Sequence, residues 1–450
     1  MRRITILLIG WSFPLFGQVK EPLSIDRALA IGLEQSKVLK ASSMNVEVST
    51  AKASEASALL LPSLKLEGGY RRLSDVDPFR VVVPFSPNPI TISPVVLDNY
   101  TFRLSVQQPL FTGFRLRSSV RAVERLAEAA QFDYRADEAD LLLNIKTAYW
   151  LLSQTLEVKR FVDENVARLE MHVKDTENLL KAGAATRNDL LKIQVQLSTG
   201  KLAQIDADND VRLVRMKLNN VLGLPLDRGF LLSSRPVAAD TVQDRLGLNG
   251  GPEEQEGSVQ ALVNRALGLR PDLRSMDYMV EANKARLSAA LGNWWPQVYL
   301  TGSYYYNRPN SRYLPTRDEF KASWDIGVQF QFDLWNWGAT WNQADEARAQ
   351  LRQAEYLYDQ MRDNVALDVR NNYLQLQRNR KKIEVAKFAI AQSEENARST
   401  NDKFKNGLAT SSDLLDADVA LLQSQTNLTG ALIEFELSKA RLERAVGGHE

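Results

Sequence analysis

The carboxylates Asp413 and Asp416 are the side chains of this sequence whose spacing most clearly suggests chemistry. Three positions apart in a helix, they share one face, and in a trimer they would form two stacked rings of carboxylates. Such rings select cations. Other reactive groups are scarce, because the chain has no cysteine and only two histidines, His172 and His449. We expect both histidines on the surface, and we predict no catalytic residue, no metal site, no cofactor and no enzymatic activity.

The segment around Asp413 has the features of a tight turn between two helices. Gly407 suits the left-handed conformation that ends a helix. Thr410 and Asp413 have the spacing of a capping box, in which each side chain accepts a hydrogen bond from the other residue's backbone N–H. The same residue types recur at the same spacing earlier in the chain, at Gly183, Thr186 and Asp189. We therefore predict two equivalent turns between helices.

Asp416 has no counterpart in the earlier turn. It lies one helical turn beyond the capping position, and the residue at the equivalent place is Lys192. Capping is a sufficient role for Asp189, whereas Asp416 needs another explanation. Either it lines a pore together with Asp413, which is the role we predict, or it lies on a solvated helix face.

The elements that hold these turns are predicted to be very long helices. Residues 114–182 and 339–406 contain no glycine and no proline. Because these two residue types weaken or break helix interiors, each span is predicted to form one helix, about 100 Å long at about 1.5 Å per residue. Val369, Leu376 and Ile383 recur every seven residues, which indicates a coiled-coil-like seam.

The two halves of the chain are predicted to be tandem copies of one unit. Similar residues match with an offset of 224 along the long helices, and with an offset of 234 nearer the start of each half. The matches include Tyr149 and Tyr373, Gly183 and Gly407, Gly223 and Gly447, and Pro62 and Pro296. We predict a first repeat at 19–227, a linker at 228–257 and a second repeat at 258–448. Each repeat would contain a helix (about 24–60 and 258–293), two strands, a very long helix, a turn and a closing helix.

Four strands are predicted, at about 63–72, 100–108, 297–307 and 323–332. In the last of them Ile326 and Val328 share one face, whereas Gly327 and Gln329 share the other. Such alternation over roughly ten residues is typical of membrane β-barrels, although a half-buried sheet of a soluble protein has the same pattern. Aromatic residues near the strand ends are predicted to lie at the membrane interface. They are Trp294, Trp295, Tyr304, Tyr305, Tyr306, Trp324, Trp335 and Trp337.

The start of the chain has the layout of an export signal. Arg2 and Arg3 precede an apolar run from Ile4 to Phe16, which predicts a signal peptide at 1–18; an ordinary buried N-terminal segment is the alternative. No later apolar run is long enough for a spanning helix. Four strands are too few to close a barrel, and an open edge in lipid would leave backbone groups without partners. Several copies must therefore share one barrel.

Together these features resemble the TolC-like outer-membrane efflux protein family over essentially the whole mature chain. The resemblance is carried by the paired repeats, by the strand-to-helix turns QPLFTG (108–113) and DLWNWG (333–338), and by the repeat endings NVLG (220–223) and RAVG (444–447). It implies a mainly α-helical fold with a membrane β-barrel. Three chains would share twelve strands, and their long helical hairpins would form an α-barrel tunnel through the periplasm. The implied location is the outer membrane, in contact with lipid.

The resemblance also implies functional positions and partners. Asp413 and Asp416 would line the narrowest part of the tunnel, and the two turns would form the tip that a periplasmic adaptor (membrane fusion) protein grips. The tip residues are Gly183, Ala184, Ala185, Thr186, Gly407, Leu408, Ala409 and Thr410. The duct would passively export small molecules, metals or proteins, driven by an inner-membrane RND or ABC transporter. Ala409 stands where a gate-locking arginine is often found, which leaves open whether Arg187 or Arg398 takes that role.

Two other classes of protein explain part of the sequence. An exported coiled-coil structural or adhesin protein accounts for the long helices and the signal, but not for four amphipathic strands at matching places. A periplasmic hydrolase would need a nucleophile, a base and a pocket, and the repeats offer none. Because positive and negative residues are interleaved and the net charge is only +1, no nucleic-acid partner is predicted. The exit duct is the function we expect.

Overall fold

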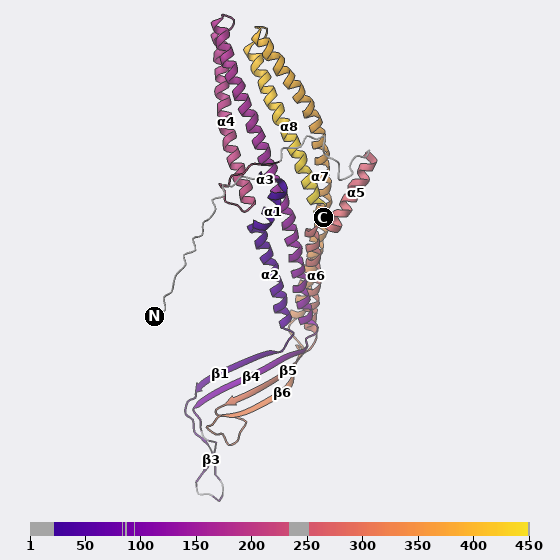
Figure 1. Cartoon of the computed structure of the whole chain (residues 1–450). Coiled ribbons are helices and arrows are strands. Elements are labelled where there is room, and N and C mark those ends of the chain that lie inside the picture. The colour runs from indigo at the N-terminus through magenta and orange to yellow at the C-terminus, as the bar shows by residue number, and fades with distance from the viewer. Residues whose placement is uncertain (1–21, 83, 86–87, 94, 234–251, 449–450) are drawn as a thin grey trace, which may run out of the picture. The chain divides into compact units, whose positions relative to one another are not determined.

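The protein is described by a computed structural model that covers residues 22–82, 84–85, 88–93, 95–233 and 252–448 (Figure 1). The predicted signal peptide and the middle of the predicted linker lie outside these residues. The chain divides into two compact units. The helical unit comprises Met1–Lys40, Asp137–Leu269 and Val365–Glu450, and the sheet unit comprises Ala41–Ala136 and Arg270–Asn364.

Helices make up most of the described chain. They are α1 (Ile25–Gln35), α2 (Lys37–Ala58), α3 (Arg115–Lys181), α4 (Arg187–Val221), α5 (Pro252–Leu269), α6 (Pro271–Leu291), α7 (Ala339–Lys405) and α8 (Ser411–Ala445), with the short 3-10 helix η2 (Gly292–Trp294). The strands are β1 (Ser63–Arg72), β2 (Phe79–Val81), β3 (Ile90–Ser93), β4 (Asp98–Phe111), β5 (Gln297–Asn307) and β6 (Lys321–Gln331). None of the described helices is both long and apolar enough to cross a membrane.

The very long helices predicted from the missing glycines and prolines are confirmed. Helices α3 and α7 contain 67 residues each, and the helices that follow them, α4 and α8, contain 35 residues each. The bounds of α3 and α4 recur in α7 and α8 with the same offset of 224 residues that the sequence matches have. Each long helix therefore turns back into a shorter partner at the same point of its repeat (Figure 1).

The helices predicted before the strands were wrong in one respect, because each is two helices. The predicted helix at 24–60 breaks at Ser36, whose hydroxyl accepts a hydrogen bond from the first turn of α2. The predicted helix at 258–293 breaks before Pro271, and Arg270 adopts an extended ψ of 122°. A proline disfavours helical geometry in the residue that precedes it, which explains the second break.

The seam predicted along the long helices packs the helical unit. Val369 and Ile383 of α7 are 0% and 3% exposed. The corresponding line of α3 is interrupted by Lys159, whose ammonium nitrogen lies 2.6 Å from a carboxylate oxygen of Asp163 and 3.1 Å from one of Asp208 on α4. The interruption in the apolar pattern is thus occupied by a cation that links α3 to its partner helix.

The sheet unit holds an antiparallel sheet in the order β1-β4-β5-β6. Its strands match the four predicted from alternation, and the pairing of β4 with β5 joins the two repeats. Strands β1 and β6 form its two edges. Strands β2 and β3 pair in a second, two-stranded sheet, in a stretch where the sequence predicts only a loop.

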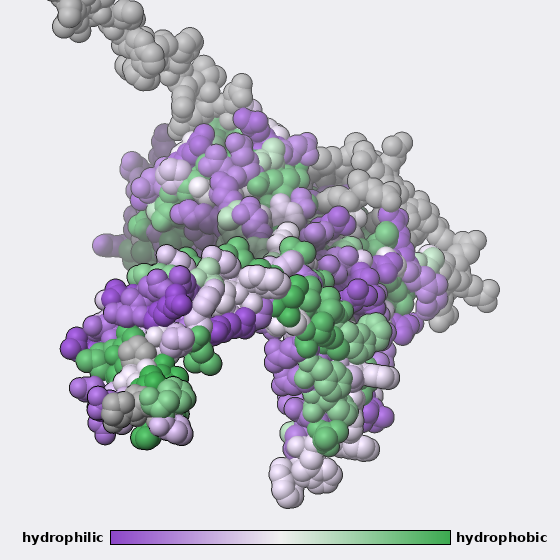
Figure 2. All heavy atoms as spheres, turned by 90° about the horizontal axis from the view of Figure 1, so that it is seen from below, coloured by the Kyte–Doolittle hydropathy of each residue, from purple (hydrophilic) through white to green (hydrophobic). Residues whose placement is uncertain are grey.

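The strand register gives the larger sheet one polar and one apolar face. One cross-strand row consists of Lys65, Ser105, Ser303 and Asp325, and the next row, on the opposite face, consists of Leu66, Leu104, Tyr304 and Trp324. The apolar face is uncovered within the described chain, where Leu66 is 77% and Trp324 67% exposed. Seen from the strand end, hydrophobic side chains form contiguous exposed patches beside hydrophilic ones (Figure 2). The alternation predicted from the sequence is therefore real in the folded sheet.

Candidate functional site

The two turns between long and short helices have the capping geometry that the sequence predicts. Gly183 and Gly407 both have φ of 73°, the left-handed conformation that glycine adopts at low cost. A Cβ built on either glycine would meet no atom within 4 Å. The requirement for glycine at these positions is therefore conformational and not one of space.

Asp413 has its carboxylate engaged in the second capping box. Its Oδ2 accepts hydrogen bonds from the backbone N of Thr410 at 2.9 Å and from the Thr410 hydroxyl at 2.7 Å. In return the Thr410 hydroxyl accepts from the Asp413 backbone N. The hydrogen bond from the Thr410 side chain, followed by that from its backbone, lowers the pKa of Asp413 below its usual value. The side chain is thus held as an anion at the start of α8.

Asp189 repeats this arrangement and adds a contact to the other turn. Its Oδ2 accepts from the Thr186 backbone N at 3.0 Å, while its Oδ1 accepts from the Ser411 hydroxyl at 2.8 Å. The hydrogen bonds from Thr186 and then from Ser411 lower the pKa of Asp189. Lys192 donates to the hydroxyl of Ser412 at 3.4 Å. The start of α4 is therefore tied to the start of α8 by two polar contacts that sequence reasoning missed.

Asp416 lies on the same exposed face of α8 as Asp413. Its carboxylate forms no hydrogen bond or ion pair with another residue that the structure describes. Leu414 and Ala417, on the opposite face, are 1% and 3% exposed. The structure thus places both predicted pore carboxylates at one surface, with Asp416 available to a further partner.

Ala409, which stands where the resemblance suggests an arginine, contributes to apolar packing. Ala409 packs against a buried cluster of Ile193, Phe404 and Leu414 near the turns. Arg398 is exposed and forms an ion pair of 2.7 Å with Glu395 of its own helix. Most of the other tip residues, such as Leu408, are exposed. A small hydrophobic cluster therefore lies at the point where the resemblance suggests an arginine latch.

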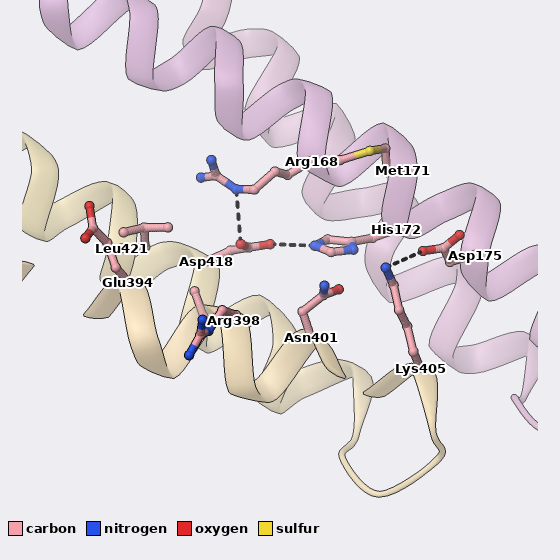
Figure 3. Close-up of a pocket in the computed structure, with 11 residues that line it drawn as sticks. Arg168, Met171, His172, Asp175, Glu394, Arg398, Asn401, Lys405, Asp418 and Leu421 are labelled. Carbon is pink, nitrogen blue, oxygen red and sulfur yellow. Dashed lines mark hydrogen bonds and ion pairs between the residues drawn. The ribbon is translucent and has the colours of Figure 1, made fainter. Parts of the chain in front are cut away.

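The expectation that His172 lies on the surface was wrong. His172 of α3 and Asp418 of α8 are each 5% exposed, and the histidine Nε2 lies 3.0 Å from a carboxylate oxygen of Asp418. Arg168 donates to the other oxygen at 3.3 Å (Figure 3). His172 lies less than two helical turns from the buried Val166 of the same helix, which was a local sign of burial. Its partner is 246 residues away, so nothing local predicts the pair.

A cavity of about 260 Å³ adjoins this ion cluster. Figure 3 shows Glu394, Arg398, Asn401 and Lys405 of α7 lining one side, with Arg168 and His172 on α3 opposite. Lys405 lies 3.9 Å from Asp175, again joining α7 to α3. The cavity is thus lined by both positive and negative groups. No cluster of three or more metal-ligating side chains occurs among the described residues.

The predicted interface aromatics fall into two groups in the sheet unit. Tyr304, Tyr306 and Trp324 lie on the apolar face toward one end of the strands. The second group, at the end where strands meet helices, is Trp294, Trp295, Trp335 and Trp337. Tyr305 was wrongly included, because the register places it on the polar face opposite Arg103.

The turns from strand to long helix hold aromatic residues in an unusual backbone conformation. Gly113 and Phe114 have φ of 59° and 65°, and their counterparts Trp337 and Gly338 have 56° and 82°. Positive φ is uncommon for a bulky residue and costs free energy. A Cβ on Gly113 would clash with the backbone of Gly292. The repeated turn keeps an exposed aromatic side chain at each junction, a feature that the sequence pattern did not reveal.

Comparison with known proteins places this geometry in a family. The model of the family described as "Outer membrane efflux protein" matches residues 29–224 and 262–448. The outer membrane efflux protein BepC of Brucella suis is 24% identical over 77% of this chain and 72% of its own length. The alkaline protease secretion protein AprF of Pseudomonas aeruginosa is 22% identical over 78% and 70%. The crystal structure of VceC from Vibrio cholerae has a TM-score of 0.77 at 18% identity, covering 94% of this chain and 96% of that one. The chain therefore belongs to the outer membrane efflux protein family, the TolC-like exit ducts of efflux and secretion systems in the outer membrane.

Proposed function

We propose that three copies of this chain form the duct, and that Asp413 and Asp416 from each copy make its narrowest point. TolC-like channels form trimers and work with periplasmic adaptors and inner-membrane pumps. The observation that carries the proposal is the shared exposed face of the two carboxylates at the end of the longest helical hairpins. Three copies would place six carboxylates around one passage. Such an array attracts cations and binds multivalent ones most strongly.

The test is cation block of single channels in planar bilayers. Hexamminecobalt(III), added from the tip side, should block the wild type, and Asp416→Asn should weaken the block roughly tenfold, the effect of about 1.4 kcal/mol. Conductance should rise in the same variant and further in the double variant with Asp413→Asn. Asp402→Asn removes an exposed carboxylate of α7 near the same turn and serves as the matched control. Unchanged block in the double variant would show that the pair lies away from the pore.

The turns themselves are proposed to dock the periplasmic adaptor. Both turns are exposed and their glycines have open space around them, so an incoming helical hairpin could approach the backbone closely at the two glycines. Gly183→Trp or Gly407→Trp should abolish export in cells, because the bulky residue would block docking and strain the left-handed turn. The amount of assembled oligomer in the outer membrane should stay the same. Normal export by both variants would contradict the proposal that the two turns dock the adaptor.

For the cargo and the pump we propose only their general classes. We propose export of small molecules, metals or proteins by an RND or ABC transporter, with the duct itself passive. The names of two relatives include both efflux and secretion of a protease, which fits a duct that leaves selection to its pump. The family is one of transport proteins, and we propose no catalytic activity for this chain.

A further inference from the structure

The polar face of the four-stranded sheet carries an excess of positive charge. Its charged residues, read from the strand register, are Lys65, Glu67, Arg71, Arg103, Lys321 and Asp325. The opposite face carries only Arg72 and Asp98, which pair with each other at 3.2 Å near the strand ends. Because barrel strands turn their polar face to the lumen and their apolar face to lipid, the positive excess belongs to the lumen.

The middle of the loop of residues 308–320, between β5 and β6, contacts this polar face, whereas Arg308 and Phe320 at its ends lie against the ring of Tyr100 on the opposite face. Asn310 is 3% exposed and donates to the Ser323 hydroxyl at 2.9 Å. Arg312 donates to the Asp325 carboxylate at 2.9 Å. Ser323 and Asp325 both belong to the polar face. We call residues 308–320 the inward loop, because Asn310 and Arg312 turn its middle toward side chains of the polar face.

Arg103 is the cation at the centre of this arrangement. Its guanidinium nitrogens donate to the Ser303 hydroxyl at 3.3 and 3.1 Å. Its guanidinium carbon lies over the ring of Tyr305, 5.5 Å from the ring centre. Arg312 of the inward loop approaches the same ring at 5.8 Å. Arg103 forms no ion pair with another described residue, and its side chain is exposed. A neutral hydroxyl and an aromatic ring thus orient a guanidinium whose charge is not compensated.

The remaining charges in the region do not cancel this excess. Arg312 is paired with Asp325, and Arg308 with Asp318 at 2.7 Å within the inward loop. Arg317 and Lys321 share Glu319. Glu67 is the cross-strand neighbour of Arg103, yet Lys65 and Arg71 lie on the same strand and face. The polar face and the inward loop together keep a net positive charge, which every additional copy of the chain would multiply.

We propose that the barrel opening is an anion-attracting constriction, with Arg103 as the residue that determines its preference and the inward loop as the element that narrows it. The ligand class is the carboxylate, sulfonate or phosphate group of a passing molecule, which a guanidinium recognises through paired N–H donors. The inference rests on the shared barrel of this family and not on the carboxylate tip. The barrel opening and the carboxylate turns would then have opposite charge preferences.

Tripolyphosphate block in planar bilayers tests the proposal. Added from the strand side, tripolyphosphate should block wild-type channels, and Arg103→Gln should raise its apparent dissociation constant roughly tenfold, the loss of about 1.4 kcal/mol. Arg103→Lys should retain part of the block, because the charge stays while the paired N–H donors are lost. Arg72→Gln, which removes a guanidinium from the opposite face of the sheet where it pairs with Asp98, is the matched control and should leave the block unchanged.

A second readout separates this site from the tip. In the Asp413→Asn/Asp416→Asn background, the reversal potential in a KCl gradient should indicate a preference for chloride, and Arg103→Gln should reduce that preference. If the channels conduct but Arg103→Gln changes neither the tripolyphosphate block nor the ion preference, the proposal is overturned. The proposed duct function would still stand. A wild type that forms no conducting channel would overturn the duct itself, and this inference with it.

Discussion

Asp413 and Asp416 share an exposed face of α8, but only the carboxylate of Asp413 also forms hydrogen bonds within the described chain. Its carboxylate closes the capping box with Thr410, and this was predictable because a capping box depends on residues three positions apart. The contact from Asp189 to Ser411 was not predictable. The contact requires two helix starts, 222 residues apart in the chain, to lie side by side. An aspartate and a serine do not by themselves predict such a contact.

The lowered pKa of Asp189 predicts how stability depends on pH. A carboxylate whose pKa is lower in the folded than in the unfolded state stabilises the fold above its unfolded pKa, and this contribution is lost as the pH falls through the folded value. Asp189→Asn should therefore melt at a lower temperature than the wild type at pH 7, with the difference fading below about pH 4. Circular dichroism of detergent-solubilised protein across this range measures it. A difference of constant size from pH 7 to pH 3 would contradict the role of the ionised carboxylate.

The cluster of His172, Asp418 and Arg168 could not be predicted from the types of these residues alone. His172, in a polar helix, was expected to face water, because charged groups are rarely buried without partners. Its partner Asp418 lies on a helix of the other repeat, and Arg168 of its own helix donates to the same carboxylate. Burying these polar and charged side chains costs free energy unless they form hydrogen bonds with each other. The bonds to Asp418 form only when α3 and α8 pack together.

At the scale of elements, alternation predicted the strands because the pleat of a strand sends successive side chains to opposite faces. The register confirms that β1, β4, β5 and β6 place most of their polar residues on one face. The strand pair β2 and β3 escaped prediction, since three and four residues are too few for a periodic pattern. The left-handed Trp337 also escaped it, because sequence preference alone assigns that conformation to glycine.

Two neighbouring positions of β6 test which face meets lipid. Val328 lies on the apolar face and Gln329 on the polar face. Val328→Arg should reduce the protein recovered from the outer membrane, since an arginine facing lipid costs roughly 2–4 kcal/mol near the midplane of a barrel. Gln329→Arg should insert normally, because its side chain would face water. Equal recovery of the two variants, measured by fractionation and immunoblotting, would contradict the assignment of the faces.

At the scale of the whole molecule, the duplication did most to make the fold predictable. Long glycine-free spans fixed α3 and α7, and the repeated turn fixed where α4 and α8 begin. Oligomerisation followed from the strand count, because β1 and β6 leave two open edges that lipid cannot satisfy. The charge of the barrel opening did not follow, since Arg103, Tyr305 and Arg312 meet only through strand register and a loop that folds back.

Native mass spectrometry of the protein extracted gently from outer membranes tests the central claim most directly. The edges of one four-stranded sheet can be satisfied in lipid only by strands of other copies, and twelve strands suffice for a barrel. The account predicts a complex of three chains that dissociates to single chains on heating in denaturing detergent. A folded single chain as the membrane-extracted species would contradict it.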